Sequence, residues 1–297
     1  MKLNKNQEKF AELQEELTKQ LYEEYDPEVN KLKDLQNKNK IDLLQKIANI
    51  MLVYTISKEF MNLNNKDRLK LRSELFATIT DSFKNEYDIE NNKTYELLNS
   101  CSKDKFYSNC YLYSFGVNYN LKPVSEKVLE DIINVRIEGK NYSERIWNNK
   151  NDLAKKVKVE VNDFLNGKTT VNEINNRISK RYNQNWDNTD RLVNNEISRV
   201  QEGANEEWRK EHNIKYVMYS ATLDRHTCSD CGKYDGETYE VNKKPVELPK
   251  HIRCRCTYIS IVSKDWKPTL RLDNMTKERI NYQTYKEWLE KQNINDK

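Results

Sequence analysis

Two short runs near the C-terminal end, Cys228-Ser-Asp-Cys231 and His251-Ile-Arg-Cys254-Arg-Cys256, contain five potential metal ligands. Structural zinc takes four ligands in a tetrahedron, and a Cys-x-x-Cys turn presents two thiolates to one ion. Cys254 and Cys256 are two residues apart, so in an extended segment both side chains point to the same face. His251 lies three residues before Cys254, close enough to approach the same ion. We therefore predict a structural zinc site with Cys228, Cys231 and Cys254 as ligands and Cys256 or His251 as the fourth.

Three other uses of these cysteines compete with structural zinc. A redox pair would lie at a strand-to-helix turn and would not need the second run. Disulfides would use the same cysteines in an oxidising environment. A catalytic zinc would keep one position open beside a general base, for which Glu237 and Asp224 are candidates. The region is small, rich in loops and poor in aliphatic residues, so a structural metal best explains its stability.

The sequence around the cysteines changes from helical to strand periodicity. Apolar and polar residues alternate over residues 216–221, 238–241 and 257–262, which predicts three strands. Beyond them the tail predicts one more helix, with Ile280 and Trp288 on its apolar face.

The first part of the chain has the periodicity of long helices. Between Pro27 and Gly116 there is neither glycine nor proline, so nothing there interrupts a helix. Residues 91–122 are less regular, and the spacing of Cys101 and Cys110 matches no metal motif, so we expect free thiols. Three narrow apolar stripes predict a bundle or long hairpin. They comprise Phe10, Leu13, Leu17, Leu21 and Tyr25; Leu44, Ile47, Met51 and Tyr54; and Leu71, Leu75, Ile79 and Phe83.

Helix start and stop signals divide the middle of the chain. Ser125 is expected to cap a helix, and a break at Gly139 precedes a helix that starts at Ser143 and stops near Gly167. Thr170 and Glu173 have capping-box spacing and open a short helix. Another helix is predicted over residues 189–212.

The predicted fold is therefore mainly α: a long helical N-terminal region followed by a small α+β module stabilised by metal. We expect four segments, namely a helical region at residues 1–122, a helical middle segment at 123–190, the Cys/His module at 191–265 and a helical tail at 266–297.

Composition excludes several classes of protein. The apolar fraction is 36% and the charged fraction 33%, whereas ordinary domains have about 45–50% and about 25%. The 51 basic and 47 acidic residues nearly balance, so no polybasic nucleic-acid arm is present. No apolar run approaches the roughly 18 residues of a membrane span, and the N-terminus lacks the apolar core of a secretory signal. We expect a protein kept in a reducing cytosol, without membrane contact.

The cysteines lie within longer motifs, which read Asp224-Arg-His-Thr-Cys228, Tyr234-Asp-Gly-Glu-Thr-Tyr239 and Pro249-Lys-His-Ile-Arg-Cys254-Arg-Cys-Thr257. Together with Asn195-Glu196-Ile-Ser-Arg199, they resemble the phage Mu protein F-like domain of head morphogenesis (minor capsid) proteins. Asn195 stands where the family usually has Thr, and Ile252 where it usually has Pro. The segment from Gly139 to Trp147 also resembles the stretch before this domain in longer members of the family, so the resemblance covers roughly residues 136 to 262.

This resemblance implies a minor head protein that acts in procapsid assembly at the portal vertex. Its partners would be the portal protein and other capsid or scaffold proteins. It would be present in the host cytoplasm during assembly and then in the virion, and in some phages such proteins leave with the DNA.

The resemblance also gives structural importance to Glu196, Arg199, Asp224, Arg225 and Gly236. Residues i and i+3 share one helix face, so we expect a buried pair between this helix and the first cysteine loop, either Glu196–Arg225 or Asp224–Arg199. The alternative is that these charges are solvated.

Two further functions were weighed. A zinc-ribbon nucleic-acid-binding protein would use the basic residues near the cysteines, Lys243, Lys244, Lys250, Arg253 and Arg255, and its DNA binding would depend steeply on salt. The second is an enzyme such as an ADP-ribosyltransferase or nuclease, but the length outside the Cys/His module reads as helical, so no such domain is expected to fit. The chain also has only three histidines for general acid/base chemistry. We therefore expect no enzymatic activity and, at most, weak contact with double-stranded DNA.

Overall fold

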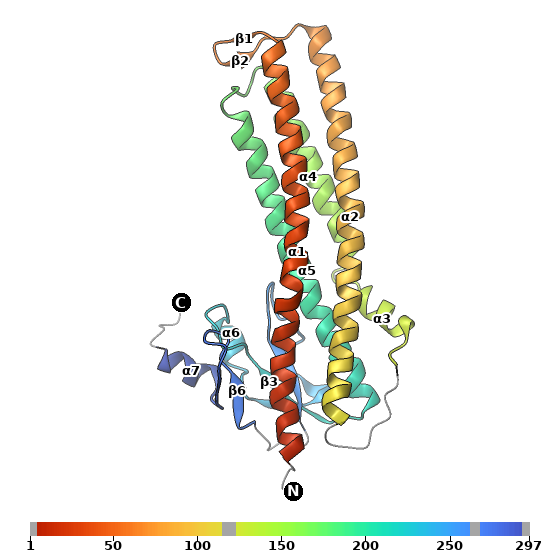
Figure 1. Ribbon diagram of the computed structural model, residues 1–297, viewed down its shortest axis with the longest axis vertical. Helices are drawn as coiled ribbons and strands as arrows, with labels where there is room; N and C mark the ends of the chain where they lie inside the picture. Colours follow the sequence, from red (N-terminus) through yellow and green to blue (C-terminus); the bar gives the residue numbers. More distant parts are fainter. Residues whose placement is uncertain (1–4, 115–122, 262–267, 293–297) are drawn as a thin grey trace. The chain divides into compact units, whose positions relative to one another are not determined.

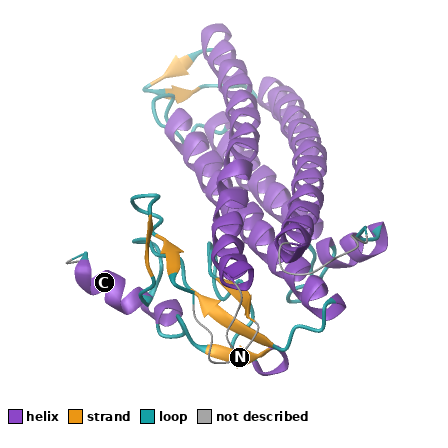
Figure 2. Ribbon diagram, turned by 60° about the horizontal axis from the view of Figure 1, so that its bottom comes forward, coloured by secondary structure: helices purple, strands orange, loops and turns teal. Residues whose placement is uncertain are grey.

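The computed structural model describes residues 5–114, 123–261 and 268–292. Long helices dominate, namely α1 (Lys5–Val53), α2 (Asn65–Ser114), α4 (Tyr142–Leu165) and α5 (Ile174–Glu211), with α3 (Glu126–Ile133) shorter (Figure 1). Small sheets follow in the C-terminal part (Figure 2). The mainly α class with a small α+β module is thus confirmed. None of the described helices is long and apolar enough to cross a membrane.

The chain forms two compact units, each assembled from separate segments. The module unit consists of Met1–Asp26, Glu96–Val135 and Asn194–Lys297, and the bundle unit of Pro27–Tyr95 and Arg136–Val193. Helices α1, α2 and α5 each contribute residues to both units. The division into four segments that we expected from the sequence stays a prediction.

The bundle unit buries the second and third apolar stripes that the sequence predicted, whereas the first stripe lies in the module unit, with the side chain of Phe10 outside the described residues. Residues recurring every three or four positions on α1, α2, α4 and α5 meet in one core, as expected for amphipathic helices. Its fully buried members include Ile47, Leu75, Ile79, Val157, Val161, Phe164, Ile174 and Ile178. Between α1 and α2 the chain forms a hairpin of β1 (Ile56–Ser57) and β2 (Phe60–Met61), which the sequence analysis missed.

Three helix boundaries differ from the prediction. α2 continues to Ser114 through the stretch that we expected to be irregular, because Leu98, Cys101 and Phe106 are buried at helical spacing. The start of α4 is capped by Asn141 and not by Ser143. The Thr170 capping hydrogen bond to the Glu173 amide is present, at 3.2 Å, but the helix that follows runs uninterrupted to Glu211 instead of being short.

The module unit contains the three strands predicted around the cysteines. β3 (Tyr216–Ser220) lies between β4 (Thr238–Glu240) and β5 (Thr257–Ile261), and both pairings are antiparallel. Ser125 caps α3 as predicted, accepting a hydrogen bond from the Val128 amide.

The tail was predicted only in part. It holds a hairpin of β6 (Leu270–Leu272) and β7 (Arg279–Asn281), followed by α7 (Tyr285–Lys291). Ile280 therefore lies in a strand and not in the helix. Asp273 explains the difference, because its Oδ1 accepts hydrogen bonds from the Met275 and Thr276 amides and closes the turn of the hairpin.

Candidate metal centre

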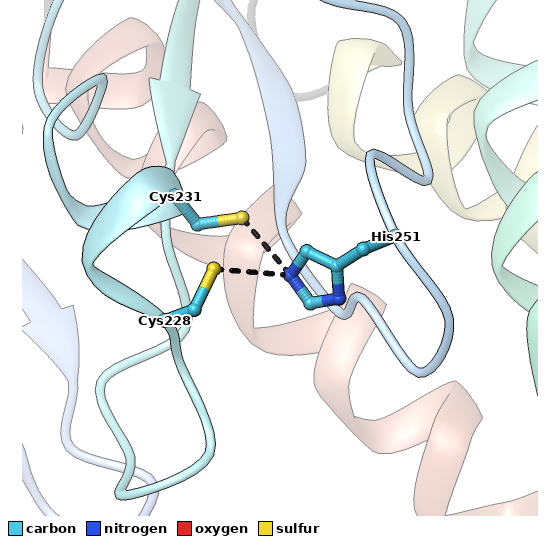
Figure 3. A group of neighbouring side chains, drawn as sticks. All are labelled: Cys228, Cys231 and His251. Carbon is cyan, nitrogen blue, oxygen red and sulfur yellow. Dashed lines mark hydrogen bonds between the residues drawn. The ribbon is translucent and has the colours of Figure 1, made fainter. Parts of the chain in front are cut away.

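The first two cysteines lie on α6 (Ser229–Gly232), a single helical turn with Cys228 as its N-cap. The amides of Cys231 and Gly232 both donate to the Cys228 carbonyl at 3.0 Å, which curls the Cys-x-x-Cys segment. The preceding loop is held by Asp224, whose Oδ1 accepts from the His226 and Thr227 amides at 2.8 and 2.9 Å. This local structure directs both sulfurs toward His251 (Figure 3).

His251 brings its imidazole between these two sulfurs. Nε2 lies 3.3 Å from the Cys228 Sγ and 3.2 Å from the Cys231 Sγ. Ordinary zinc bond lengths in a tetrahedron give a sulfur–nitrogen separation of about 3.6 Å, so a small outward shift would seat an ion here. Nδ1 lies 2.9 Å from the Ile252 carbonyl. A proton on Nδ1 donated to that oxygen leaves the Nε2 lone pair for metal.

A second group shares Cys231 with the first. The sulfurs of Cys231, Cys254 and Cys256 all lie within 4.8 Å of one another and are buried. Hydrogen bonds from Cys231 and Cys256 hold the pKa of the Cys254 thiol well below its usual range. The same contacts raise the pKa of Cys231 and of Cys256, so the three thiols share hydrogen bonds around one thiolate, the metal-binding form, at Cys254.

The five residues predicted as ligands are therefore brought together, and the cluster could hold a metal ion. Both groups include Cys231, so an ion bound there can take its other ligands from either side. Thiolates with imidazole form the donor set that zinc takes in structural sites. The identity of the ion and the choice of four ligands stay predictions. Among the described residues, all six cysteines are free of disulfides.

The charged motif residues make different contacts from those expected. Arg199 donates to Glu196 at 2.7 Å within α5, and its other nitrogens donate to the carbonyls of Ile132 and Ile133 at the end of α3. Asp224 pairs with Arg255.

Neither Glu196–Arg225 nor Asp224–Arg199 is formed among the described residues, and Arg225 is exposed. The sequence-based pairing was wrong because each carboxylate has a partner closer in space: Arg199 on the same helix face for Glu196, and the loop amides with Arg255 for Asp224.

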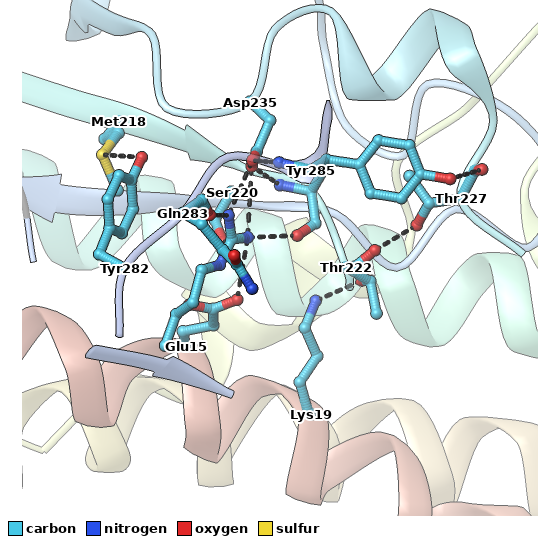
Figure 4. A network of polar contacts seen from close by, with 12 residues as sticks. Glu15, Lys19, Met218, Ser220, Thr222, Thr227, Asp235, Tyr282, Gln283 and Tyr285 are labelled. Carbon is cyan, nitrogen blue, oxygen red and sulfur yellow. Dashed lines mark hydrogen bonds and ion pairs between the residues drawn. The ribbon is translucent and has the colours of Figure 1, made fainter. Parts of the chain in front are cut away.

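Next to the cysteines lies a buried ion pair that sequence reasoning missed. Asp235 accepts hydrogen bonds from the amides of Ala221 and Tyr285, at 2.7 and 2.6 Å, and from Arg271 at 2.7 Å (Figure 4). The side chains of Arg271 and Asp235 are 1% and 0% exposed. The Asp-Gly motif was a signal for Asp235. Arg271 gave none, because a single arginine in a presumed helical tail looks like a solvated charge.

Gly236 follows Asp235 and turns the chain back toward β3. Its φ is +77°, and a Cβ there would lie 2.5 Å from the hydroxyl oxygen of Tyr282. Its amide donates to the Tyr219 carbonyl at 2.9 Å. Glycine tolerates both this backbone conformation and the close approach, which gives a physical reason for the predicted importance of Gly236.

Comparison with known proteins identifies relatives of the chain. Residues 155–259 match the model of the family described as Phage Mu protein F like protein, which confirms the resemblance and supports a role in phage head morphogenesis. The chain is also 23% identical over 310 residues to NAD(+)--arginine ADP-ribosyltransferase EFV of Enterococcus faecalis (strain ATCC 700802 / V583). That match covers 96% of this chain but only 60% of the relative's length. No solved structure matches the chain.

The expectation that the chain is not an enzyme is therefore wrong. The curated relative matched along nearly the whole chain carries the name of an enzyme, an arginine ADP-ribosyltransferase. The expectation rested on the helical reading of the rest of the chain, which leaves no room for an enzyme domain, and on the small number of histidines. Carboxylates also act as general acids and bases, and the chain has 47 acidic residues.

Proposed function

We propose that this chain is a minor capsid protein of a tailed phage that acts in procapsid assembly at the portal vertex. The supporting observation is the family match over residues 155–259, which contains the Cys, Asp-Gly and Glu-x-x-Arg motifs in their expected order. These motifs all belong to the module unit. During assembly the protein would be in the host cytoplasm and afterwards in the virion, where it could take part in DNA delivery.

In this proposal, zinc stabilises the module unit. The ion would be held by Cys231 and three of its four neighbours, Cys228, His251, Cys254 and Cys256. Three of these cysteines belong to a core that also contains Tyr219, Tyr258 and Trp288. Bound zinc would supply a crosslink between α6 and the segment that precedes β5, which replaces the aliphatic contacts that this small module lacks.

The bundle unit offers a surface for capsid-protein partners. At the turn between α1 and α2, Leu52 and Val53 are 85% and 76% exposed, and Ile56 and Leu69 are 40% and 63% exposed. Exposed apolar side chains that form a contiguous patch are typical of protein interaction sites, and we infer such a patch at this turn. The Val171 amide donates to the Glu59 carbonyl at 2.9 Å, which fixes the hairpin to the loop before α5. A surface held in this way loses little conformational entropy on binding.

Zinc-ribbon binding of nucleic acid is less well supported. Most of the basic residues near the cysteines pair with carboxylates: Lys243 with Glu240, Lys244 with Glu206, Lys250 with Asp230 and Arg255 with Asp224. Charges neutralised in this way contribute less to phosphate binding. We therefore expect any DNA binding to be weak at physiological salt.

Binding to purified portal protein, followed by phage complementation, tests the proposed function. The wild-type chain should bind the portal at physiological salt, and a Leu52→Ser/Val53→Ser variant should bind at least about tenfold more weakly, equivalent to about 1.4 kcal/mol. An Ile41→Ser variant, which removes a single exposed apolar side chain eleven residues before Leu52 on α1, is the control and should bind like wild type.

Phage carrying Cys254→Ser should yield fewer infectious particles than wild type. Normal titres after deletion of the gene, together with absence of the protein from purified virions, would refute the assembly function. Tight, salt-resistant binding to one DNA sequence would instead favour the nucleic-acid alternative.

A further inference from the structure

Lys19 places a buried ammonium group beside the cysteine cluster. It lies on the part of α1 that belongs to the module unit, and it is only 4% exposed. Its Nζ donates to the Thr222 Oγ1 at 2.6 Å and to the Arg255 carbonyl at 2.5 Å (Figure 4). Arg255 is the residue between the two candidate ligands Cys254 and Cys256. Lys19 therefore holds the backbone of the Cys-x-Cys segment directly.

The hydrogen-bond acceptors of Lys19 are both uncharged oxygens. Within the described part of the chain, no carboxylate lies within the 4.0 Å that defines an ion pair with Nζ. The nearby carboxylates have other cationic partners, since Glu15 contacts Arg271 and Asp224 pairs with Arg255. A buried charge without a counter-ion is strongly unfavourable, so the position of Lys19 needs a source of negative charge.

A metal–thiolate centre supplies that charge. Zinc bound by four thiolates carries two net negative charges, and zinc bound by three thiolates and a neutral imidazole carries one. Cys256 and Lys19 are close enough to influence each other electrostatically. Without the metal, burial lowers the pKa of Lys19 and Glu15 is the main charge that opposes this shift; a metal–thiolate centre would add further negative charge beside the ammonium.

We propose that Lys19 is the charge-balancing and positioning residue of the metal centre, so that metal binding and docking of the first turns of α1 stabilise each other. The proposal rests on the zinc site proposed above. Such coupling is reciprocal: whatever strengthens metal binding strengthens helix docking by the same factor.

Other buried residues also dock this part of α1: Leu21, Tyr22 and Tyr25 are at most 8% exposed, and Glu15 pairs with the buried Arg271. Gln14 accepts a hydrogen bond from the Ser260 amide at 2.8 Å, Glu16 pairs with Arg279, and Glu23 pairs with Lys277. The latter two pairs are substantially exposed, and exposed ion pairs stabilise a contact only weakly. Loss of the charge that balances Lys19 should therefore weaken the docking of this segment, while its buried apolar side chains keep it attached.

Zinc affinity measured by competition with a chelator, under reducing conditions, tests the proposal. Lys19→Met removes the charge with little change in volume, and Lys19→Gln removes the charge but keeps a donor. We expect both variants to bind zinc about 10- to 100-fold more weakly than wild type. Lys277→Met is the matched control, since it removes a lysine that also contacts α1 through the exposed Glu23 pair. The control should change zinc affinity less than about twofold.

Hydrogen exchange of residues 13–25 gives an independent readout. Chelation of wild-type protein should speed exchange in this segment, whereas Lys19→Met should exchange at the same rate with and without zinc. Metal-free Lys19→Met should melt no lower than metal-free wild type, which checks that the variant folds. Zinc binding by wild type with unchanged affinity in both Lys19 variants would overturn this inference alone. Failure of wild type to bind zinc would overturn both this inference and the proposed zinc site.

Discussion

At the scale of single residues, the ion pair between Asp235 and Arg271 connects the cysteine-bearing loop to the tail. Replacing Asp235 with Ala would leave the Arg271 guanidinium buried without its closest anion and would remove the acceptor for the Ala221 and Tyr285 amides. Breaking a buried pair in this way costs about 3–5 kcal/mol. We therefore expect a large decrease in the free energy of unfolding, measured by urea denaturation.

The matched control is Glu16→Ala, which removes the partner of Arg279 on the surface of the same unit. This exposed pair should contribute less than about 1 kcal/mol. Equal destabilisation by the two substitutions would show that burial of Asp235 does not determine its contribution.

Buried charged residues could not be predicted from the sequence, whereas the candidate metal ligands could. The ligand candidates were found because cysteine and histidine at fixed spacing have few other uses. Lys19 and Arg271 were missed because a charged residue in a helix or tail is usually solvated. Only the fold shows that both are buried beside the cysteine cluster.

At the scale of secondary structure elements, the boundaries that could be predicted are those set by local sequence patterns. The strands and the Ser125 cap follow from local patterns, and the structure contains them. The continuation of α2 was hidden because its buried face includes polar residues. These residues are Glu86, Glu90, Thr94, Ser102, Lys105 and Asn109, which interrupt the apolar periodicity while facing the interior. The β6–β7 hairpin was missed because three-residue strands are too short to show alternation.

Two of these polar residues, Glu86 and Glu90, pair with a buried lysine and support a prediction about the bundle unit. Lys150 on α4 contacts Glu86 at 3.2 Å and Glu90 at 2.7 Å on α2, and all three side chains are at most 2% exposed. Lys150→Met would leave two buried carboxylates facing each other without a cation. We expect a loss of about 3–5 kcal/mol of stability at pH 7, measured as the urea midpoint.

The pH dependence of this variant distinguishes charge from packing. Burial raises the pKa of Glu86 even in the wild type, and Lys150 opposes this shift. A carboxyl whose pKa is raised by folding stabilises the protein at low pH, and this stabilisation is lost as pH rises through the folded pKa. In Lys150→Met the opposing charge is absent, so its deficit relative to wild type should shrink as pH falls from 7 to 5. A deficit independent of pH would indicate lost packing instead.

At the scale of the whole molecule, the division into two units separates the metal centre from the apolar core of the bundle. All five ligand candidates lie in the module unit, whereas the core around Ile47, Ile79 and Phe164 lies in the bundle unit. The module unit draws on three separate stretches of chain. Local patterns could not reveal this assembly, because it depends on contacts between residues more than two hundred positions apart, such as Lys19 with Thr222.

Metal removal should therefore affect the two units unequally. A structural ion stabilises only the unit that binds it, by about 2.7 kcal/mol when free zinc is one hundred times its dissociation constant. In reducing buffer, we expect a chelator to accelerate hydrogen exchange across β3 and β5, while residues 153–165 of α4 stay protected by their apolar contacts. Added zinc should restore the original rates, which separates metal removal from irreversible damage. If exchange rises equally in both units, they unfold together and metal is not local to the module. If it rises in neither, the cluster does not stabilise the protein through a metal ion.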